Sequence, residues 1–245
     1  MWMEQALYLK DNYKKEFETK VKSVNDKFVV LEKTLFYPNS GGQPHDTGKL
    51  IDEKGNEYNV VYVGKFNGNI SHEVDSKGLK EGIKVKGNIN WERRYNFMRY
   101  HTASHLISGL VYKHEDAIIT GNQIKDKKDE ARVDFNIKNF NRDFFEMIER
   151  KANELIKEGR EVSKELISVE KAKEIPNLVK IAKGLPKNIK EIRVVEVEDL
   201  DIQPCGGCHL DNISEIGEID IFKLKNKGSD NRRVYFKLKD WLITI

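Results

Sequence analysis

Hydrophobic and polar residues alternate in short runs over the first 90 positions of the chain. Such alternation is typical of half-buried strands. Turn residues separate the runs at Asn25-Asp26, at 53–57 and at 66–69. The expected strands cover residues 17–24, 27–31, 49–52, 58–63, 70–74 and 83–89. Short strands with regularly spaced turns predict a small β-barrel or sandwich.

From Trp91 the apolar spacing becomes helical, and the pattern predicts a helix from there to about Tyr112. A second helix is expected from Asn141, a good N-cap, to about Gly159. Further strands are expected at 117–124, 131–137, 162–169, 192–197, 216–224 and 233–238. The whole pattern predicts an α+β protein, with a small β-barrel domain over residues 1–90 and an α+β domain over 91–245.

Composition narrows the class of protein. Charged residues make up 34% of the 245 positions, above the usual share of about 25%. The 43 basic and 40 acidic residues nearly cancel, giving +3, so a nucleic-acid footprint would have to be local. Two cysteines argue against a disulfide scaffold, and no apolar run approaches the roughly 18 residues of a membrane span. We expect a cytoplasmic protein that does not enter a membrane.

Candidate metal chemistry begins with His101 and His105. Histidines four residues apart on a helix share one face and can bind one metal ion. Thr102 stands where the metalloprotease motif has its glutamate, so that motif is excluded. Such a pair is about as often structural, so it does not decide the matter alone.

A short loop, Cys205-Gly206-Gly207-Cys208-His209, supplies further nitrogen and sulfur donors, a mixture that suits tetrahedral zinc. Cys205, Cys208 and His209 compete for the positions that His101 and His105 leave, because five ligands exceed the usual zinc shell. The spacing of four favours Cys205 and His209, with Cys208 lining a pocket or replacing a ligand. We expect one zinc ion per chain.

These motifs together resemble a known family. His-Thr-Ala-Ser-His (101–105) and Cys-Gly-Gly-Cys-His (205–209) look like the HxxxH and CxxxH motifs of the alanyl-tRNA synthetase editing domain. Residues 36–48, FYPNSGGQPHDTG, are similar to the glycine-rich segment of the barrel that precedes that domain, and 118–124 and 131–135 also match in order. No aminoacylation motifs are present. The sequence therefore resembles the free-standing AlaX editing proteins in their medium form, whose editing domain is like that of threonyl- and alanyl-tRNA synthetases.

The resemblance implies a zinc-dependent hydrolase that deacylates mischarged tRNA(Ala), chiefly Ser-tRNA(Ala) and, in some members, Gly-tRNA(Ala). The family usually has threonine at the position of Cys208. Candidate catalytic or substrate-binding residues are Ser104, Thr120, Asn122, Gln123, Cys208, Gly41 and Gly42. The alternative interpretation is that residues 120–123 form only a polar turn and that Gly41-Gly42 belong to a plain loop, neither of them contacting substrate. Two other functions stay open: a non-catalytic RNA-binding module with a structural zinc, and an editing enzyme for another mischarged tRNA.

Seven cations against one acid between Lys223 and Lys239 form a locally basic stretch. A hairpin turning at Gly228-Ser229 would bring its strands together for phosphate binding. Lysines that protect a sheet edge from aggregation are the alternative reading. Arginines within three turns of His101 form a second candidate contact with tRNA. The expected tRNA-binding residues are Arg93, Arg94, Arg99, Lys223, Lys225, Arg233 and Lys237.

Overall fold

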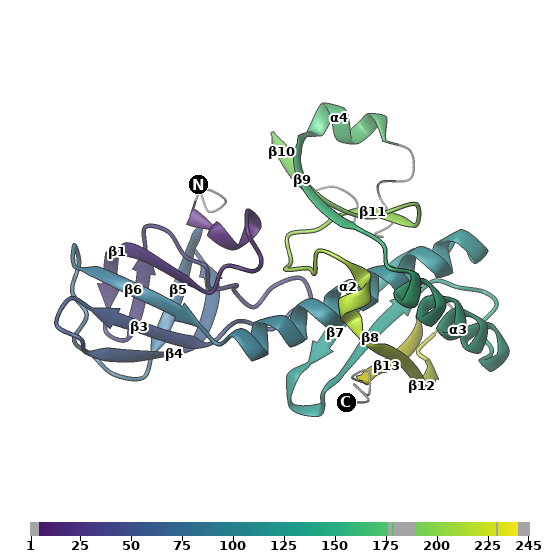
Figure 1. Cartoon of the computed structure of the whole chain (residues 1–245), viewed down its shortest axis with the longest axis horizontal. Coiled ribbons are helices and arrows are strands. Elements are labelled where there is room, and N and C mark those ends of the chain that lie inside the picture. Colours follow the sequence, from purple (N-terminus) through teal and green to yellow (C-terminus); the bar gives the residue numbers. More distant parts are fainter. Residues whose placement is uncertain (1–4, 176–177, 179–189, 229, 240–245) are drawn as a thin grey trace. The chain divides into compact units, whose positions relative to one another are not determined.

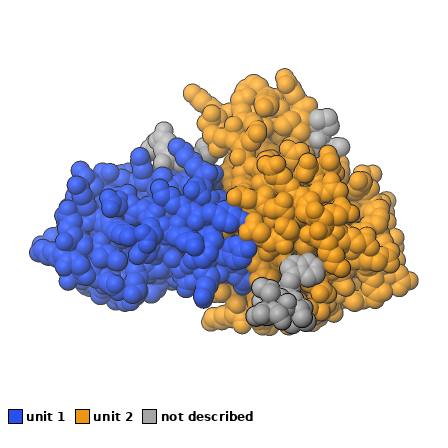
Figure 2. All heavy atoms as spheres, viewed as in Figure 1, with its two compact units in different colours: residues 1–97 blue, residues 98–245 orange. Residues whose placement is uncertain are grey.

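A computed structural model describes residues 5–175, 178, 190–228 and 230–239 (Figure 1). The chain divides into two compact units, residues 1–97 and 98–245, which are coloured separately in Figure 2. The division lies after Phe97, within helix α2 (Trp91–Glu115), whereas the sequence pattern changes near residue 90.

Unit 1 is a closed six-stranded β-barrel, which confirms the barrel expected from the alternating pattern. Its strands follow the order β1-β2-β5-β4-β3-β6, and all neighbouring strands are antiparallel. The strand bounds are β1 Glu16–Asn25, β2 Phe28–Leu31, β3 Gly48–Asp52, β4 Glu57–Phe66, β5 Asn69–Val74 and β6 Lys84–Ile89. The 3-10 turn η1 (Leu7–Leu9) precedes them. The expected strands are therefore all present, with ends that differ by a few residues.

Period-two burial explains why the barrel closes around its own side chains. In β5, Ile70, His72 and Val74 are buried and alternate with more exposed residues. The His72 ring is satisfied inside, because Nδ1 lies 3.0 Å from the carbonyl oxygen of Val29 and Nε2 lies 2.8 Å from the hydroxyl of Thr34. Burial lowers the pKa of His72 to about 4, so the ring is neutral in the folded protein.

Arg94 forms a buried ion pair with Asp46 inside unit 1. The guanidinium Nε lies 3.1 Å from both carboxylate oxygens, and Nη2 also bonds Asp46. Nη2 and Nη1 donate to the carbonyl oxygens of Leu35 and Asn12 at 2.6 and 3.2 Å. Both charged side chains are fully buried. The prediction that Arg94 binds tRNA is therefore wrong, because a guanidinium with no exposed surface cannot reach a phosphate.

Unit 2 contains two antiparallel sheets and the helices packed on them. One sheet has the order β11-β10-β9, and the other β12-β13-β8-β7. The bounds are β7 Ile119–Lys125, β8 Glu130–Phe135, β9 Val162–Ser168, β10 Glu191–Val197, β11 Asp201–Pro204, β12 Glu218–Asn226 and β13 Arg232–Lys239. The helices are α3 Arg142–Glu158 and α4 Val169–Glu174, with 3-10 turns η2 Asp126–Lys128 and η3 Ile213–Ile216. Asn141 caps α3 as expected, since its side chain accepts the Phe144 N–H at 2.8 Å.

Helix α2 is buried on all sides from Tyr100 to Val111, not only along the apolar stripe that the sequence predicts. Within unit 2 it contacts both sheets. The Tyr100 ring packs 5.8 Å from that of Phe236 in β13, between ring centroids, and Gly109 lies against Asp201 of β11. Small residues such as Ala103 and Gly109 permit this close packing. Among the described helices, none is long and apolar enough to cross a membrane.

Candidate metal centre

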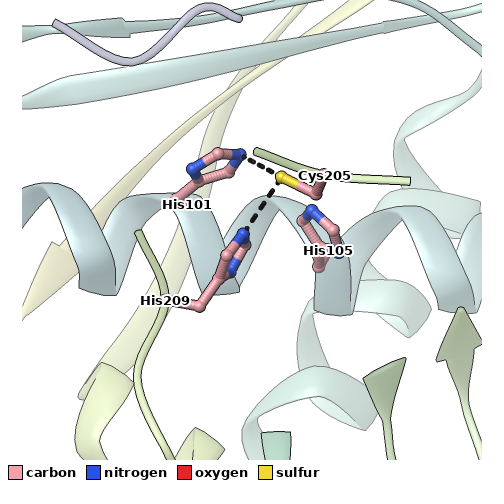
Figure 3. Close-up of side chains that lie close together, drawn as sticks. All are labelled: His101, His105, Cys205 and His209. Carbon is pink, nitrogen blue, oxygen red and sulfur yellow. Dashed lines mark hydrogen bonds between the residues drawn. The ribbon is translucent and has the colours of Figure 1, made fainter. Parts of the chain in front are cut away.

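Four side chains converge where helix α2 meets the loop that follows β11 (Figure 3). The helix contributes His101 and His105, and the loop contributes Cys205 and His209. One donor atom from each lies within 4.8 Å of all the others. The Cys205 Sγ atom is 3.5 Å from Nε2 of His101 and 3.3 Å from Nε2 of His209. The structure thus brings together the four residues that the spacing of the two motifs favours.

The geometry fits a zinc ion. Tetrahedral zinc holds thiolate sulfur at about 2.3 Å and imidazole nitrogen at about 2.0–2.1 Å, which places sulfur and nitrogen roughly 3.6 Å apart. The two sulfur–nitrogen distances here, 3.5 and 3.3 Å, are close to that value. Three imidazoles and one thiolate also form a donor set that zinc prefers. The three histidines are nearly fully buried, whereas Cys205 keeps some exposure.

Cys208 lies outside this group of four, although the sequence leaves it as a competing ligand. Its side chain is completely buried, and the cysteine is not bonded to Cys205. The loop directs the sulfur of Cys205 and the ring of His209 toward the helix. A pocket-lining role for Cys208 stays a prediction.

Arg193 of β10 holds the ligand loop in shape. Its Nη1 donates to the carbonyl oxygens of Cys205 and Gly207, at 2.9 and 2.8 Å. The Cys205 N–H donates to the Arg193 carbonyl oxygen at 3.0 Å, and the Gly207 N–H points at the Cys205 sulfur at 3.4 Å. Arg193 itself is buried. The sequence contains no local signal for this contact, because the arginine and the loop meet only through strand pairing.

Electrostatics favour a thiolate at Cys205 before any metal binds. Burial would raise the pKa of the Cys205 thiol, but the charge of His101 and His209 and hydrogen bonds from His101 and His105 hold it well below its usual value. Burial would lower the pKa of His105, yet hydrogen bonds to Asp201 and Cys205 raise it to about 9. Burial, together with the charge of His101, lowers the pKa of His209. Binding of a metal ion would therefore release a proton from His105.

Side chains outside the group of four contact two of its histidines. The His105 Nδ1 atom is 3.1 Å from Oδ2 of Asp201, and Gln203 donates to the same carboxylate oxygen at 2.7 Å. The Thr102 hydroxyl is 3.2 Å from Nδ1 of His209. Sequence reasoning missed these roles. Alternation of residues 201–204 was the available signal, since it places Asp201 and Gln203 on one strand face directly before Cys205.

The predicted pocket residues of α2 and β7 differ in their burial and in the hydrogen bonds that they form within the protein. Ser104 is buried, and its hydroxyl donates to the Tyr100 carbonyl oxygen at 2.9 Å. The Thr120 hydroxyl oxygen is buried and has no hydrogen-bond partner within the described part of the chain. Asn122 is partly buried, whereas Gln123 is exposed and accepts from Nε of Arg132 at 3.2 Å. Thr120 is thus the residue of this set with an unsatisfied buried hydroxyl.

Gly41 and Gly42 form a tight turn in unit 1. Their φ angles are +59° and +83°, and Ser40 and Gln43 exchange two backbone hydrogen bonds of 3.2 and 3.0 Å. Two consecutive positive φ angles are typical of a type I′ turn, which glycine adopts without steric strain. The Tyr37 hydroxyl donates to the Ser40 carbonyl oxygen at 3.1 Å. The segment is therefore an ordered hairpin, and its contribution to an editing pocket stays a prediction.

The basic stretch forms the β12–β13 hairpin. Ser229, in the expected turn, lies outside the described residues. Lys225 pairs with Arg233, and Lys223 pairs with Tyr235, so these four residues share one sheet face. The Nζ atoms of Lys125 and Lys223 lie 4.5 and 5.5 Å from the centre of the Tyr235 ring. This face therefore concentrates positive charge around an aromatic residue.

The predicted tRNA contacts on unit 2 are not equally available. Lys223, Lys225 and Lys237 are exposed. Arg233 instead binds both carboxylate oxygens of the buried Asp134, at 2.8 and 2.9 Å, and Asp134 also binds Arg132, so the guanidinium of Arg233 is already engaged within the protein. Lysines are therefore the stronger candidates on this face.

The two other predicted arginines lie on α2 and are partly buried. Within unit 1, Arg93 donates to the His45 carbonyl oxygen at 3.0 Å. Within unit 2, Arg99 donates to the Ile216 carbonyl oxygen at 2.8 Å. Each therefore already holds a backbone carbonyl, and tRNA contact by either stays a prediction.

Comparison with known proteins adds independent information. Residues 4–93 match the family model "tRNA synthetases class II (A)", and residues 192–235 match "Threonyl and Alanyl tRNA synthetase second additional domain". The chain is 52% identical over 245 residues to the alanyl-tRNA editing protein AlaX-M of Methanosarcina barkeri, covering 97% of this chain and 100% of that protein. It is 43% identical over 239 residues to the AlaX-M protein of Saccharolobus solfataricus, with the same coverage. An alanine–tRNA ligase of Sulfurisphaera tokodaii is 37% identical over 90% of this chain, but only 25% of that enzyme is matched.

Proposed function

Because the chain belongs to the family of the AlaX-M alanyl-tRNA editing proteins, we propose that it hydrolyses the ester bond of mischarged tRNA(Ala). The protein is then an aminoacyl-tRNA hydrolase that acts in the cytoplasm, where charged tRNA is used. The observation that carries the proposal is the convergence of His101, His105, Cys205 and His209 from two motifs about one hundred residues apart. The second motif, residues 205–209, lies within the segment that matches the threonyl and alanyl tRNA synthetase second additional domain.

A zinc ion bound by these residues is part of the proposal. When bound, zinc supplies a Lewis acid that can polarise a carbonyl group or orient a substrate. Four protein ligands would fill a tetrahedral shell, so water or the substrate would reach the ion only by displacing a ligand or by expanding the shell to five. Ester hydrolysis also requires donors for the developing oxyanion. The same four ligands are what a structural zinc would have, so activity decides between editing and simple RNA binding.

Selection of serine over alanine is the specific chemical problem of this enzyme. The two aminoacyl groups differ by one hydroxyl, which the pocket must sense. The buried, unpartnered hydroxyl of Thr120 supports a role in this recognition. A serine hydroxyl would satisfy it, whereas alanine would leave it unpaired at a cost of about 1–3 kcal/mol. Several such groups together can reach a discrimination of roughly 10⁴-fold. We therefore propose Ser-tRNA(Ala) as the main substrate. Gly-tRNA(Ala), whose aminoacyl group also lacks the hydroxyl, is proposed as a second substrate from the family resemblance alone.

The tRNA itself is proposed to contact the basic face of the β12–β13 hairpin. Lys223, Lys225 and Lys237 are exposed there, and phosphate binding needs such a stripe of cations. The bidentate pair between Arg233 and Asp134 makes that arginine a weaker candidate than the lysines. The lysines also sit on β12 and β13 at one side of the sheet, so protection of the edge by charge is the competing explanation.

The test is to measure bound zinc and deacylation of Ser-tRNA(Ala) for the wild type and His105→Ala. The wild type, purified without chelator, should contain one zinc per chain and release serine. His105→Ala should lose both. A wild type that binds tRNA and zinc but never deacylates would support the non-catalytic alternative. Deacylation of another mischarged tRNA in place of tRNA(Ala) would support the second alternative.

A further inference from the structure

Two of the four proposed metal ligands lie within hydrogen-bond distance of buried side chains that are not themselves proposed ligands. His105 contacts Asp201, and His209 contacts Thr102. We propose that Asp201, supported by Gln203, and Thr102 are positioning residues that hold the two imidazoles in the tautomer that presents Nε2 to the metal ion. This inference rests on the proposed metal centre.

The contact between Asp201 and His105 selects one tautomer. An ionised carboxylate only accepts hydrogen bonds, so the His105 proton must reside on Nδ1, which leaves the Nε2 lone pair free. Gln203 donates to the same oxygen of Asp201 at 2.7 Å and holds the carboxylate in place. The Gln203 amide nitrogen also lies 3.1 Å from His105 Nδ1, as two donors do when they share one acceptor oxygen. All three residues are at most 5% exposed, so water does not compete for these bonds.

Gly109 allows Asp201 to reach His105. The glycine lies one helical turn beyond His105, on the same face of α2. A Cβ atom at position 109 would lie only 2.9 Å from the Asp201 Cβ and 3.0 Å from the Leu200 Cγ. Any side chain there would push β11 away from the helix. The absence of a side chain at Gly109 is thus a local requirement for the carboxylate–imidazole contact.

The Thr102 hydroxyl contacts both the ring of His209 and the backbone of Leu210. Its hydroxyl accepts the backbone N–H of Leu210 at 3.1 Å and lies 3.2 Å from His209 Nδ1. A hydroxyl oxygen has two lone pairs, so it can accept both N–H groups. His209 Nε2 already faces the Cys205 sulfur, so the metal-binding tautomer carries its proton on Nδ1. Thr102, His209 and Leu210 have no exposed surface, which makes the bonds hard to replace with water.

These contacts explain how ligands from distant parts of the sequence meet in one geometry. His105 comes with the helix and is oriented by β11, whereas His209 comes with the loop and is oriented by the helix. The helix therefore orients the histidine on the loop, and the strand before the loop orients a histidine on the helix. Removing a group that orients a metal-binding histidine typically weakens metal affinity by about 10–100-fold.

The test measures zinc affinity by competition with a chromophoric chelator, on full-length protein stripped of metal. Thr102→Val keeps the shape of the side chain and removes the hydroxyl, so zinc should bind about 10–100-fold more weakly. Thr102→Ser restores the hydroxyl and should bind nearly as the wild type does. The matched control is Ser108→Ala, which removes another buried hydroxyl of α2 that donates to the Ser104 carbonyl oxygen. It should leave zinc affinity unchanged.

The Asp201 variants form the second arm of the test. Asp201→Ala should weaken zinc binding about 10–100-fold. Asp201→Asn keeps an acceptor oxygen without the charge, and should give an intermediate loss because charge-assisted bonds are stronger. The d–d spectrum of the Co²⁺-substituted proteins should shift in the variants that lose affinity and remain unchanged in Ser108→Ala. A role in folding alone would lower the melting temperature of the metal-free protein without moving this spectrum.

Wild-type zinc affinity in folded Thr102→Val and Asp201→Ala would overturn the inference while leaving the metal centre intact. If either variant fails to fold, Asp201→Asn decides: zinc affinity equal to that of the wild type overturns the inference. A wild type that binds no zinc would instead refute the proposed centre, and with it the function. The two failures are therefore distinguishable.

Discussion

Replacing Arg94 with alanine should destabilise unit 1 strongly, because Arg94 is the partner of a buried carboxylate. The substitution leaves Asp46 inside the protein without its counter-charge, while Asp46 still accepts the Tyr37 N–H at 2.6 Å. It also removes the donors to the carbonyl oxygens of Leu35 and Asn12. The expected consequence is loss of folding stability, not loss of a tRNA contact.

The magnitude follows from the burial of both charges. Removing one partner of a buried ion pair costs about 3–5 kcal/mol, because the other charge remains without compensation. Removing both charges should cost less. Arg94→Met combined with Asp46→Asn keeps an acceptor for the Tyr37 N–H and leaves no buried charge. The double variant should therefore be more stable than Arg94→Ala.

Urea denaturation measures these free energies of unfolding. Trp91 packs 5.7 Å from Tyr13, between ring centroids, and reports on unit 1 when Trp2 and Trp241 are replaced by phenylalanine. With a slope of about 2 kcal/mol per molar urea, a loss of about 4 kcal/mol lowers the midpoint by roughly 2 M. The double variant should unfold between the single variant and the wild type.

One result would refute this account of Arg94. Suppose that Arg94→Ala unfolds at the same urea concentration as the wild type but binds tRNA more weakly. If the slope of log affinity against log salt also falls by about 1, the value for one lost phosphate contact, then Arg94 binds RNA. The same experiment on Lys225→Ala gives the comparison. That exposed lysine should change the salt dependence and leave the urea midpoint unchanged.

Four further predictions follow from particular contacts. The pKa of His72 in the folded protein is about 4, below its ordinary value of 6.5. The neutral ring therefore contributes its full stability above pH 6.5, and about 3 kcal/mol of the free energy of unfolding is lost as the pH falls to 4. Urea midpoints should show this loss, and His72→Gln should abolish it. Thr120→Val should slow serine release by roughly 5–150-fold, the equivalent of about 1–3 kcal/mol, and leave zinc content unchanged. Cys208→Thr should retain zinc and activity by elemental analysis and deacylation assay, because Cys208 lies outside the ligand group. Lys223→Ala with Lys225→Ala should reduce the slope of log affinity against log salt by about 1–2.

Much of the fold could be predicted because its strands and helices follow their own periodicity. The period-two pattern around Ile70 and Val74 and the helical spacing from Trp91 both correspond to observed elements. The two pairs of candidate ligands could be predicted because each pair is close in the sequence. A spacing of four residues corresponds to one helical turn for His101 and His105, and to one short loop for Cys205 and His209. The local spacing of residues in the sequence is therefore enough to predict both the secondary structure and the candidate ligands.

What could not be predicted depends on contacts between distant segments. Arg94 lies 48 residues from Asp46, and nothing in the neighbouring sequence distinguishes an arginine that pairs inside a barrel from one that faces RNA. Arg193 and Asp201 likewise reach the candidate metal centre only through strand pairing and close helix packing. The spacing of the motifs could favour Cys205 over Cys208, but only the folded loop shows which sulfur faces the histidines.

The most direct test of the proposed function is the rate at which the zinc-loaded protein releases serine and alanine from the same tRNA(Ala). Acid-stable radiolabel on each aminoacyl group would be followed over time, with uncatalysed hydrolysis subtracted and His105→Ala as the inactive control. We expect rapid release of serine and nearly no release of alanine above the uncatalysed rate. Equal rates for the two, or no release of serine by protein that carries its zinc, would contradict the account.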